Sequence, residues 1–315
     1  MEVESKLAAG HRTCAGCPVP LIVRTVLGAT DNPIVATVAT GCLEVATTIY
    51  PETSWKIPII HSAFENAAAT ISGIEVAHRV LLKKKEKQAK VEGAEKLEKD
   101  LGYQLKDNIK FIAFGGDGGT YDIGLQSLSG ALERGHDFLY ICYNNEGYMN
   151  TGGQRSGSTP RGASTSTTPV GKVADGKMQF KKNLTEICVA HDIPYCAQAS
   201  PFDLVDLKNK VKKALKIKGP KFINVLSPCP TVWKFPTSNL MEVLKTAVDT
   251  KFWPIYEVEN GKYTINYTPQ EMLPVEDFLK TQKRFAHLFK SSSGQKVIEE
   301  IQRRIDLEWE KLKDK

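Results

Sequence analysis

Short apolar segments alternate with helical patterns through most of the chain. The strand-like segments span residues 34–40, 57–60, 110–114, 138–143, 195–199 and 222–226. Each is short and largely apolar, which is typical of strands that are buried on both faces of a parallel sheet. Between them, apolar residues recur at helical spacing, as at Leu125, Leu128 and Leu132. The alternation predicts an α/β fold with a doubly wound, mostly parallel sheet and helices on both of its faces.

Three segments between these elements have a character of their own. Residues 63–82 predict a helix whose small alanines permit close packing, and residues 83–107 are polar and predict an exposed excursion. Residues 150–177 are rich in Gly, Ser and Thr and show no periodicity. A loop of that length in a compact domain is usually functional or disordered, and its position favours a functional role.

After Trp233 the pattern changes. Two alternating segments flank Asn260-Gly261, which is a strong hairpin signal. A last helix is expected after Gly294, and its apolar face carries Ile298, Ile301, Ile305, Trp309 and Leu312. We therefore divide the chain into a domain of residues 1–233 and a C-terminal extension of residues 234–315. The apolar face packs either on the domain, which we favour, or on a partner subunit.

A glycine-rich run, Gly115-Gly116-Asp117-Gly118-Gly119, follows the strand at 110–114 directly. Glycines at the carboxyl end of a strand let the backbone approach a diphosphate closely. Asp117 offers a carboxylate oxygen and Asn145, after the next strand, an amide oxygen, and Mg²⁺ combines such ligands with phosphate oxygens. Neither a dinucleotide fingerprint nor a P-loop fits the spacing. The run predicts a thiamine diphosphate and magnesium site, and the alternative is a tight turn that caps a helix.

Four of the seven cysteines lie in loops beside Gly or Pro: Cys14, Cys17, Cys42 and Cys229. Two of them follow predicted strands, and ligands gather outside the carboxyl ends of strands in open parallel sheets. Four thiolates bind either zinc or an iron–sulfur cluster, and the spacing by itself slightly favours zinc. The Pro after Cys229 and a neighbouring thiamine site favour iron. The remaining cysteines, including Cys188, fall in apolar segments and are expected in the core.

Several motifs together identify a family. They are Cys14-Ala15-Gly16-Cys17, Ala39-Thr40-Gly41-Cys42-Leu43-Glu44-Val45, His61-Ser62-Ala63-Phe64-Glu65-Asn66-Ala67-Ala68-Ala69, Gly116-Asp117-Gly118-Gly119, Tyr148-Met149-Asn150-Thr151-Gly152 and Pro228-Cys229-Pro230. Over residues 10–233 the chain resembles the beta subunit of pyruvate:ferredoxin oxidoreductase and related 2-oxoacid:ferredoxin oxidoreductases. The fold that the resemblance implies is the PP-type domain of thiamine-dependent enzymes, which binds the diphosphate end of the cofactor.

The resemblance also implies roles for individual residues. Cys14, Cys17, Cys42 and Cys229 would bind a [4Fe–4S] cluster, and Asp117, the Asn145 side chain and the Gly147 carbonyl would bind Mg²⁺. Asn150 would point toward the reactive end of the cofactor and take part in catalysis. The residues expected to contact the cofactor are Gly41, Gly116, Asp117, Gly118, Gly119, Asn145, Gly147 and Asn150.

The activity implied by the resemblance is oxidative decarboxylation of a 2-oxo acid, most simply pyruvate. Electrons would pass to ferredoxin and the acyl group to coenzyme A, in a hetero-oligomer typical of anaerobic metabolism. The other subunits would be an alpha subunit with a pyrimidine-binding domain and a ferredoxin-like subunit with further clusters. Because the activating glutamate comes from another subunit in this family, the chain is expected to be inactive alone.

Three alternative functions remain open at this point. One is the beta subunit of an oxalate oxidoreductase, a close relative of the same family. Arg161 in the glycine-rich loop could suit a substrate with two carboxylates, unless it and Arg155 hold diphosphate or face solvent. The second alternative is a non-redox thiamine decarboxylase or lyase with a structural zinc. The third is a zinc-bearing scaffold that binds no cofactor.

Composition narrows the setting. The 315 residues carry a net charge of +6, with basic runs at 83–87 and 208–218. These runs lack interleaved aromatic residues, so nucleic-acid binding is not expected. We expect these lysines to lie on the solvent-exposed faces of helices. A role in attracting acidic partners is the less favoured interpretation. No apolar stretch approaches membrane-spanning length. The odd number of cysteines and the absence of a secretory pattern at the N-terminus predict a cytoplasmic location.

Overall fold

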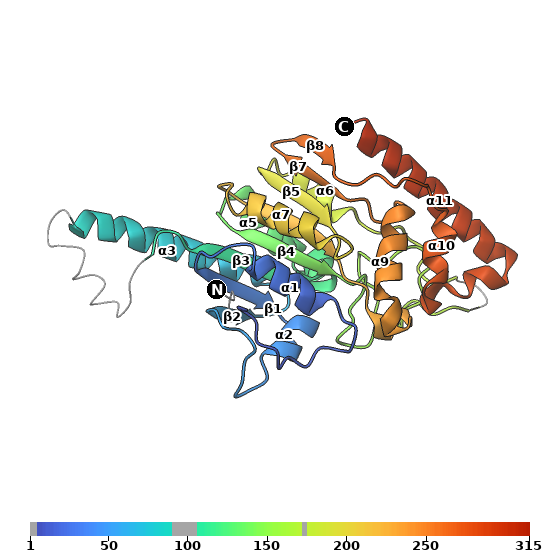
Figure 1. Cartoon of the computed structure of the whole chain (residues 1–315), viewed down its shortest axis with the longest axis horizontal. Helices are drawn as coiled ribbons and strands as arrows, with labels where there is room; N and C mark the ends of the chain where they lie inside the picture. The colour runs from blue at the N-terminus through green and yellow to red at the C-terminus, as the bar shows by residue number, and fades with distance from the viewer. Residues whose placement is uncertain (1–4, 90–105, 172–174) are drawn as a thin grey trace.

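The chain folds around one eight-stranded sheet, shown in Figure 1. The computed structural model describes residues 5–89, 106–171 and 175–315. The strands are β1 (Ile34–Ala39), β2 (Ile59–Ser62), β3 (Lys110–Gly116), β4 (Leu139–Asn144), β5 (Tyr195–Ala199), β6 (Lys221–Leu226), β7 (Tyr256–Glu259) and β8 (Lys262–Ile265). Their order is β2-β1-β3-β4-β6-β5-β7-β8, and the first six strands are parallel. The prediction of a doubly wound, mostly parallel α/β fold is confirmed.

Helices cover both faces of the sheet. The α-helices are α1 (Val19–Leu27), α2 (Cys42–Thr47), α3 (Ala67–Ala89), α5 (Leu125–Glu133), α6 (Leu184–Val189), α7 (Leu204–Ala214), α8 (Pro230–Trp233), α9 (Leu240–Asp249), α10 (Val275–Lys280) and α11 (Ser292–Lys313). A π-helix, η1, spans Gly118–Ile123, and short 3₁₀ turns span Thr237–Asn239, Lys283–Phe285 and Leu288–Lys290. In the part of the chain that the structure describes, no helix is long and apolar enough to cross a membrane.

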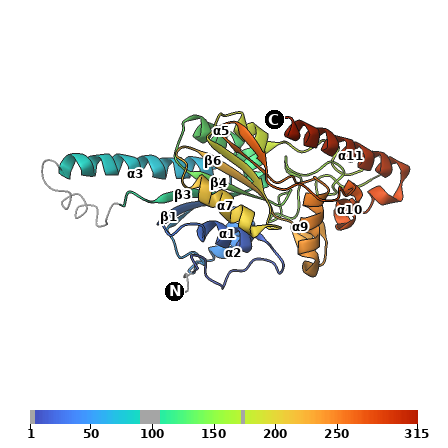
Figure 2. The same cartoon turned by 45° about the horizontal axis from the view of Figure 1, so that its top comes forward.

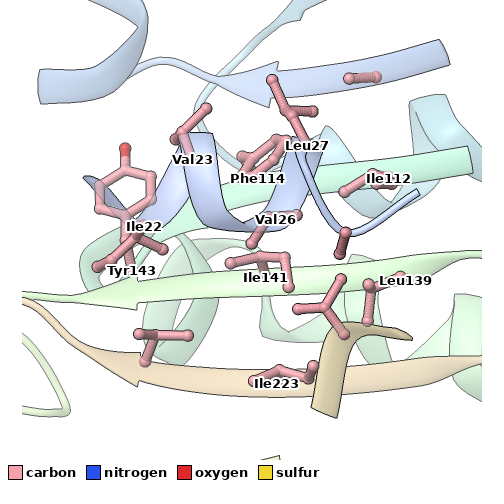
Figure 3. Close-up of a cluster of buried hydrophobic side chains, with 14 of the residues drawn as sticks. Ile22, Val23, Val26, Leu27, Ile112, Phe114, Leu139, Ile141, Tyr143 and Ile223 are labelled. Atoms are coloured by element: carbon pink, nitrogen blue, oxygen red, sulfur yellow. The ribbon is translucent and has the colours of Figure 1, made fainter. Parts of the chain in front are cut away.

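The two faces of the sheet form separate hydrophobic cores. Successive side chains of a strand point to opposite faces, so Ala36 and Val38 of β1 pack with α1 and α7, whereas Val35 and Ala39 pack with α3 and α5. Figure 3 shows the first core, where α1 lies across the strands and buries Ile22 and Val26 against them. Because both faces are covered, the central strands consist of buried apolar residues, which is the pattern that the sequence displays.

The strand order places a reversal of direction between β1 and β3. From β1 the chain passes to β2 on one side, then returns to β3 on the other side of β1 and continues to β4. Such a reversal opens a crevice at the carboxyl ends of the two strands, where ligands bind in open α/β sheets. The segments that follow β1, β3, β4 and β6 therefore meet at one edge. These four segments hold Cys42, Asp117, Asn145 and Cys229.

Helix α3 is longer than the sequence suggested. It was expected at residues 63–82, but it runs from Ala67 to Ala89 and projects beyond the sheet, as Figure 2 shows. Residues 83–87 are largely exposed, as predicted for the excursion, but they continue the helix instead of following it. The reason is that Lys, Glu, Gln and Ala are strong helix formers and continue a helix without tertiary contacts. The rest of that predicted excursion lies largely outside the described residues.

The C-terminal segment extends the same sheet. The predicted hairpin forms, and β7 pairs antiparallel with β5 and with β8. The apolar face of α11 is buried within the chain, with Ile298, Ile301, Ile305, Trp309 and Leu312 each at most 8% exposed. The first three pack in a third core with α9 and α10, and the last two reach the core under the sheet. A domain boundary at residue 233 stays a prediction.

Candidate functional site

Two cavities of the described part of the chain, of about 270 Å³ and about 130 Å³, lie near the predicted site residues and the glycine-rich loop. The smaller one lies at the crevice between β1 and β3. It is lined by Thr40, Gly41, Cys42, Phe64, Gly116, Gly118, Tyr143, Asn145, Gly147, Tyr148, Met149, Asn150 and Thr151. Six of the eight residues expected to contact a cofactor line this cavity, and the other two, Asp117 and Gly119, are their chain neighbours. We call it the switch-point cavity.

Three oxygen atoms converge beside this cavity. The side-chain oxygen of Asn145 lies 2.8 Å from Asp117 Oδ1 and 2.8 Å from the carbonyl oxygen of Gly147. None of these atoms can donate a hydrogen, so the cluster consists of acceptors only, unless the amide turns and its nitrogen donates to both neighbours. Neighbouring ligands in an octahedron with magnesium–oxygen bonds of 2.0–2.1 Å are roughly 2.8–3.0 Å apart. The spacing of the three oxygens fits a small divalent cation.

Asp117 is completely buried. Its Oδ2 accepts a hydrogen bond of 2.5 Å from Ser156 Oγ, and its Oδ1 accepts one of 3.1 Å from the backbone N–H of Asn145. Burial raises the pKa of Asp117 to about 7, although the Ser156 hydrogen bond acts in the opposite direction. A cation at the three oxygens would offset this cost, because it favours the ionised carboxylate.

The glycines after Asp117 are required by packing against the protein itself. A Cβ on Gly118 would lie 2.8 Å from the Tyr148 ring, and one on Gly119 would lie 2.8 Å from the Phe64 carbonyl oxygen. The segment forms the π-helix η1, and its first residue, Gly118, lines the cavity. At this turn the glycine backbone therefore packs closely against the segments that hold Phe64 and Tyr148. Because the glycines have no side chains, this part of the cavity stays open.

The serine- and threonine-rich loop supplies contacts that the sequence did not reveal individually. Besides Ser156 on Asp117, Ser158 Oγ donates to Asn144 Oδ1 at 2.8 Å, and Thr159 Oγ1 donates to the Glu146 carbonyl at 2.7 Å. The composition of residues 150–177 predicted a functional loop. It could not predict which hydroxyl contacts which partner, because those contacts join residues far apart in sequence.

The four loop cysteines gather at the same edge of the sheet. Burial raises the pKa of Cys17 to about 11, and the charges of Cys229 and Cys14 raise it further. Burial likewise raises the pKa of Cys42 to about 12, with further contributions from the other three cysteines. Cys17 N–H donates to the Cys14 carbonyl at 3.1 Å and closes the C-x-x-C turn. Four thiols that lie this close to one another and to the oxygen cluster are a set of donors suited to a cationic centre, which would favour their thiolate forms.

The four sulfurs do not form a ready site for one ion. Within residues 5–89, 106–171 and 175–315, no three His, Cys, Asp or Glu side chains are arranged to hold a single metal ion. In a tetrahedral zinc site all four sulfurs lie about 2.3 Å from the same atom. A four-iron cluster holds its cysteines farther apart, since each sulfur binds a different iron atom.

Neither arginine of the glycine-rich loop lines the switch-point cavity. Arg155 is exposed and its Nη1 donates to Gln179 Oε1 at 3.2 Å. Arg161 forms an ion pair with Glu300 of α11 at 2.5 Å, and its guanidinium lies over the Phe180 ring. The expectation that Arg161 is near the substrate pocket is wrong, because α11 provides a carboxylate that holds it at the larger cavity.

The larger cavity is lined by cationic and aromatic side chains. Most of its cations already have partners: Lys182 pairs with Asp122, Arg304 with Glu308 and Lys315 with Glu186. Lys181 lies over the Phe252 ring. We assign no ligand to this cavity.

Comparison with known proteins agrees with the fold. Residues 39–225 match the family described as "Thiamine pyrophosphate enzyme, C-terminal TPP binding domain". This segment begins at the end of β1 and ends in β6, so it includes the switch-point cavity. The chain therefore carries a thiamine pyrophosphate-binding domain.

Relatives define the family more closely. The chain is 49% identical to "Pyruvate synthase subunit PorB" of Thermotoga maritima, over 98% of this chain and 91% of that protein. It is 50% identical to the subunit of the same name from Methanocaldococcus jannaschii, over 96% and 95% of the two chains. It is 43% identical to "Ketoisovalerate oxidoreductase subunit VorB" of Pyrococcus abyssi, over 98% and 93%. The chain belongs to this family, the beta subunits of the 2-oxoacid:ferredoxin oxidoreductases.

A solved structure supports the fold. It is a 2-oxoglutarate:ferredoxin oxidoreductase from Magnetococcus marinus, with a TM-score of 0.57 and 20% sequence identity. The similarity covers 73% of this chain and 69% of that one. At this identity the comparison concerns the fold alone.

Proposed function

We propose that this chain is the beta subunit of a pyruvate:ferredoxin oxidoreductase. The complex would convert pyruvate, coenzyme A and oxidised ferredoxin into acetyl-CoA, carbon dioxide and reduced ferredoxin. The observation that carries the proposal is the convergence of the oxygen cluster and the four cysteines on one cavity, in a chain that matches pyruvate synthase subunits over nearly its full length. Thiamine diphosphate supplies the carbanion chemistry that decarboxylation requires, and the protein supplies position and electrostatics.

Magnesium would be held by Asp117 Oδ1, the Asn145 amide oxygen and the Gly147 carbonyl. The acceptor-only spacing of 2.8 Å between these oxygens supports this assignment. Asp117 provides the one charged ligand, and its burial means that the charge is not screened by water. The metal would in turn hold the diphosphate against the backbone of Gly116, Gly118 and Gly119.

Cys14, Cys17, Cys42 and Cys229 would hold a [4Fe–4S] cluster. Cys42 lies close enough to the other three cysteines and to Asp117 for each of them to raise its pKa. The cluster would therefore lie next to the cofactor and accept its electrons directly. The pyruvate synthase and ketoisovalerate oxidoreductase subunits that match this chain support a redox centre over zinc, so we prefer the redox enzyme to a non-redox decarboxylase or a scaffold.

The rest of the switch-point cavity would hold the substrate end of the cofactor. Phe64, Tyr148 and Met149 provide apolar walls that exclude water. Asn150 lies on the rim and offers an amide to the reacting groups. Gly41 lies at the opposite wall, where a Cβ would be 3.0 Å from Tyr143 Oη, so a side chain there would compete with that hydroxyl.

We propose partner subunits for the same complex, namely an alpha subunit with a pyrimidine-binding domain and a ferredoxin-like subunit. The names of the relatives, each called a subunit, support the need for partners. Ferredoxin and coenzyme A would be the mobile partners. Seven unpaired cysteines support a reducing location, which we propose to be the cytoplasm.

Pyruvate is the preferred substrate for two reasons. Five pyruvate synthase subunits are 47–50% identical to this chain, the ketoisovalerate subunit is 43% identical, and two further pyruvate synthase subunits, from Pyrococcus, are 41% identical. The oxalate alternative loses its structural basis, because Arg161 is held by Glu300 at the other cavity.

The test uses the purified complex under anaerobic conditions. We expect iron and acid-labile sulfide in the beta subunit, and an electron paramagnetic resonance signal of a reduced cluster after addition of pyruvate with coenzyme A. Ketoisovalerate and oxalate serve as comparison substrates. Zinc in place of iron would overturn the redox assignment, and a signal that only ketoisovalerate or oxalate elicits would overturn the choice of pyruvate.

A further inference from the structure

A buried carboxylate sits between two of the proposed metal-binding residues. Glu146 separates Asn145 from Gly147, and its side chain is fully buried. Its φ of 61° lies in the left-handed region, which is uncommon for a residue other than glycine. Its N–H donates to Asn144 Oδ1 at 3.0 Å. The surrounding structure must hold this turn, because a non-glycine residue in that conformation is strained.

The holding group comes from the C-terminal extension. Arg284 Nη2 donates to Glu146 Oε2 at 2.5 Å, across 138 positions of sequence. Its Nε donates to Gln282 Oε1 at 2.5 Å, and its guanidinium lies 3.7 Å from the centre of the Trp233 ring. The planar guanidinium is thus fixed by a hydrogen bond on one side and by a ring face on the other.

The same tryptophan also holds the neighbouring residue. Trp233 Nε1 donates to the backbone carbonyl of Asn145 at 2.9 Å. Arg284 therefore acts on the turn by two routes, directly through the Glu146 carboxylate and indirectly through the Trp233 ring. Both routes end on the turn that carries the Asn145 amide oxygen and the Gly147 carbonyl.

Stability by itself does not explain a buried ion pair. Taking both charges out of water costs about as much as their attraction returns, so apolar residues of similar volume are often as stable. Lys181 lies 3.5 Å from the other oxygen of Glu146, which has no hydrogen-bond partner among the described residues. The arrangement does fix the position of the Glu146 carboxylate, chiefly through its hydrogen bond with Arg284.

We propose that Arg284 is a positioning residue for the magnesium site. By holding Glu146 it keeps the strained turn in the conformation that directs the Asn145 and Gly147 oxygens toward Asp117. The inference rests on the proposed function, since it takes these three oxygens as magnesium ligands. It assigns the C-terminal extension a part in metal binding, although none of its residues lines the switch-point cavity.

The test measures magnesium binding apart from turnover. The complex is stripped of metal and thiamine diphosphate with a chelator, and retention of added thiamine diphosphate is then followed over a magnesium titration. For Arg284→Met we expect the magnesium concentration at half retention to rise by about tenfold to a hundredfold, the usual effect of removing a group that supports metal ligands. Arg284→Lys, which keeps the charge and loses the fork, should fall between wild type and Arg284→Met.

Two further variants separate positioning from stability. Arg304→Met removes an arginine from a half-exposed pair on α11 and should leave the titration unchanged. Glu146→Gln with Arg284→Met removes both buried charges, so the unfolding temperature should recover while magnesium binding stays weak. A wild-type magnesium midpoint in Arg284→Met, or in the double variant, would overturn the inference. If wild type itself retained thiamine diphosphate without magnesium, the proposed metal site would fail first.

Discussion

At the scale of single residues, the site is defined by charges that burial makes costly. Asp117 is fully buried beside two neutral oxygens, and its pKa is raised because burial disfavours the charged carboxylate. The pKa values of Cys17 and Cys42 are raised for the same reason. These groups are expensive in the folded chain unless they bind positive centres. The chain tolerates this cost at one edge of the sheet, which is the mark of a binding site.

Asp117→Asn should abolish tight cofactor binding. The substitution keeps the shape and removes the one charged oxygen of the cluster. Because a direct ligand contributes at least as much as its supporting partners, we expect thiamine diphosphate to bind roughly a hundredfold more weakly or worse at fixed magnesium. Equilibrium dialysis of the complex measures this. Asp107→Asn, at an exposed position, is the control and should bind normally.

Lys177 gives a prediction about pH. It is buried, its Nζ donates to the carbonyls of Ser156 and Thr159, and burial lowers its pKa to about 8 from 10.5. Between these two values the unfolded chain binds the extra proton, so this residue makes the folded state more stable as pH rises from 8 to 10.5.

The comparison with Lys177→Met isolates that contribution. We expect the unfolding free energy of wild type, relative to Lys177→Met, to increase between pH 8 and pH 10 by at most about 3 kcal/mol. Urea unfolding at several pH values measures the difference. A relative stability that falls over this range would show that the lysine is charged in the folded state throughout.

At the scale of elements, the C-terminal helix does more than cap the molecule. One face of α11 packs in the third core, and Glu300 from the same helix holds Arg161. Buried apolar residues therefore hold this 22-residue helix along its length, while its opposite face carries charged residues in solvent. The hairpin before it adds two antiparallel strands beside β5. The extension is thus integrated with the sheet in this chain.

Two substitutions on α11 test this packing. Ile301 is 4% exposed and Leu307 is 49% exposed. Ile301→Ala should lower the unfolding free energy by about 2 to 5 kcal/mol, because it leaves a cavity in a core. Leu307→Ala should change it by less than about 0.5 kcal/mol, as expected at the surface. Equal effects in urea unfolding of the purified chain would mean that the exposed face of α11 is also covered.

At the scale of the whole molecule, function depends on segments that meet only after folding. The C-x-x-C loop precedes α1, Cys42 follows β1 and Cys229 follows β6. The strand order places β1, β3, β4 and β6 side by side, so their carboxyl ends deliver two of the four cysteines and the oxygen cluster to one edge. Parallel strands make this possible, since they all end on the same side.

Iron content tests the assignment of the cysteines. Cys42→Ala should remove the cluster signal nearest the cofactor and lower the iron bound by the beta subunit, because four-cysteine clusters need every ligand. Cys188 is buried in α6, away from this edge, and Cys188→Ala should keep the full iron content. Retention of the cluster in Cys42→Ala would overturn the ligand assignment.

The isolated chain gives a prediction for the assembly. It should bind the cofactor weakly and show no turnover with pyruvate, coenzyme A and ferredoxin, because the group that activates thiamine is expected in a partner subunit. Addition of the partner subunits should restore activity, which a ferredoxin-linked assay follows. Turnover by the purified beta subunit alone would contradict this expectation.

The local pattern of apolar and polar residues predicted the elements well where the strands are buried, or where glycine and proline mark their ends. The apolar runs located the six parallel strands to within about two residues, because such runs have few other solutions. The end of α3 was predicted at residue 82 instead of 89, because the polar run that was predicted as an exposed excursion also consists of strong helix formers. Asp117, Asn145 and the cysteines were located because glycines, prolines and strand ends mark them in the sequence.

The sequence by itself determined the fold class and the family, and it singled out the residues that we propose as ligands of the cofactor, the metal and the cluster. Only the tertiary structure decided which side chains hold these residues in place, and that Arg161 lies away from the switch-point cavity. Ser156 on Asp117, Glu300 on Arg161 and Arg284 on Glu146 each join residues separated by 39 to 139 positions. No local pattern encodes such pairs, because hydrogen bonds and ion pairs depend on distance in space. The strand order sets that distance, and the chain reveals it only when folded.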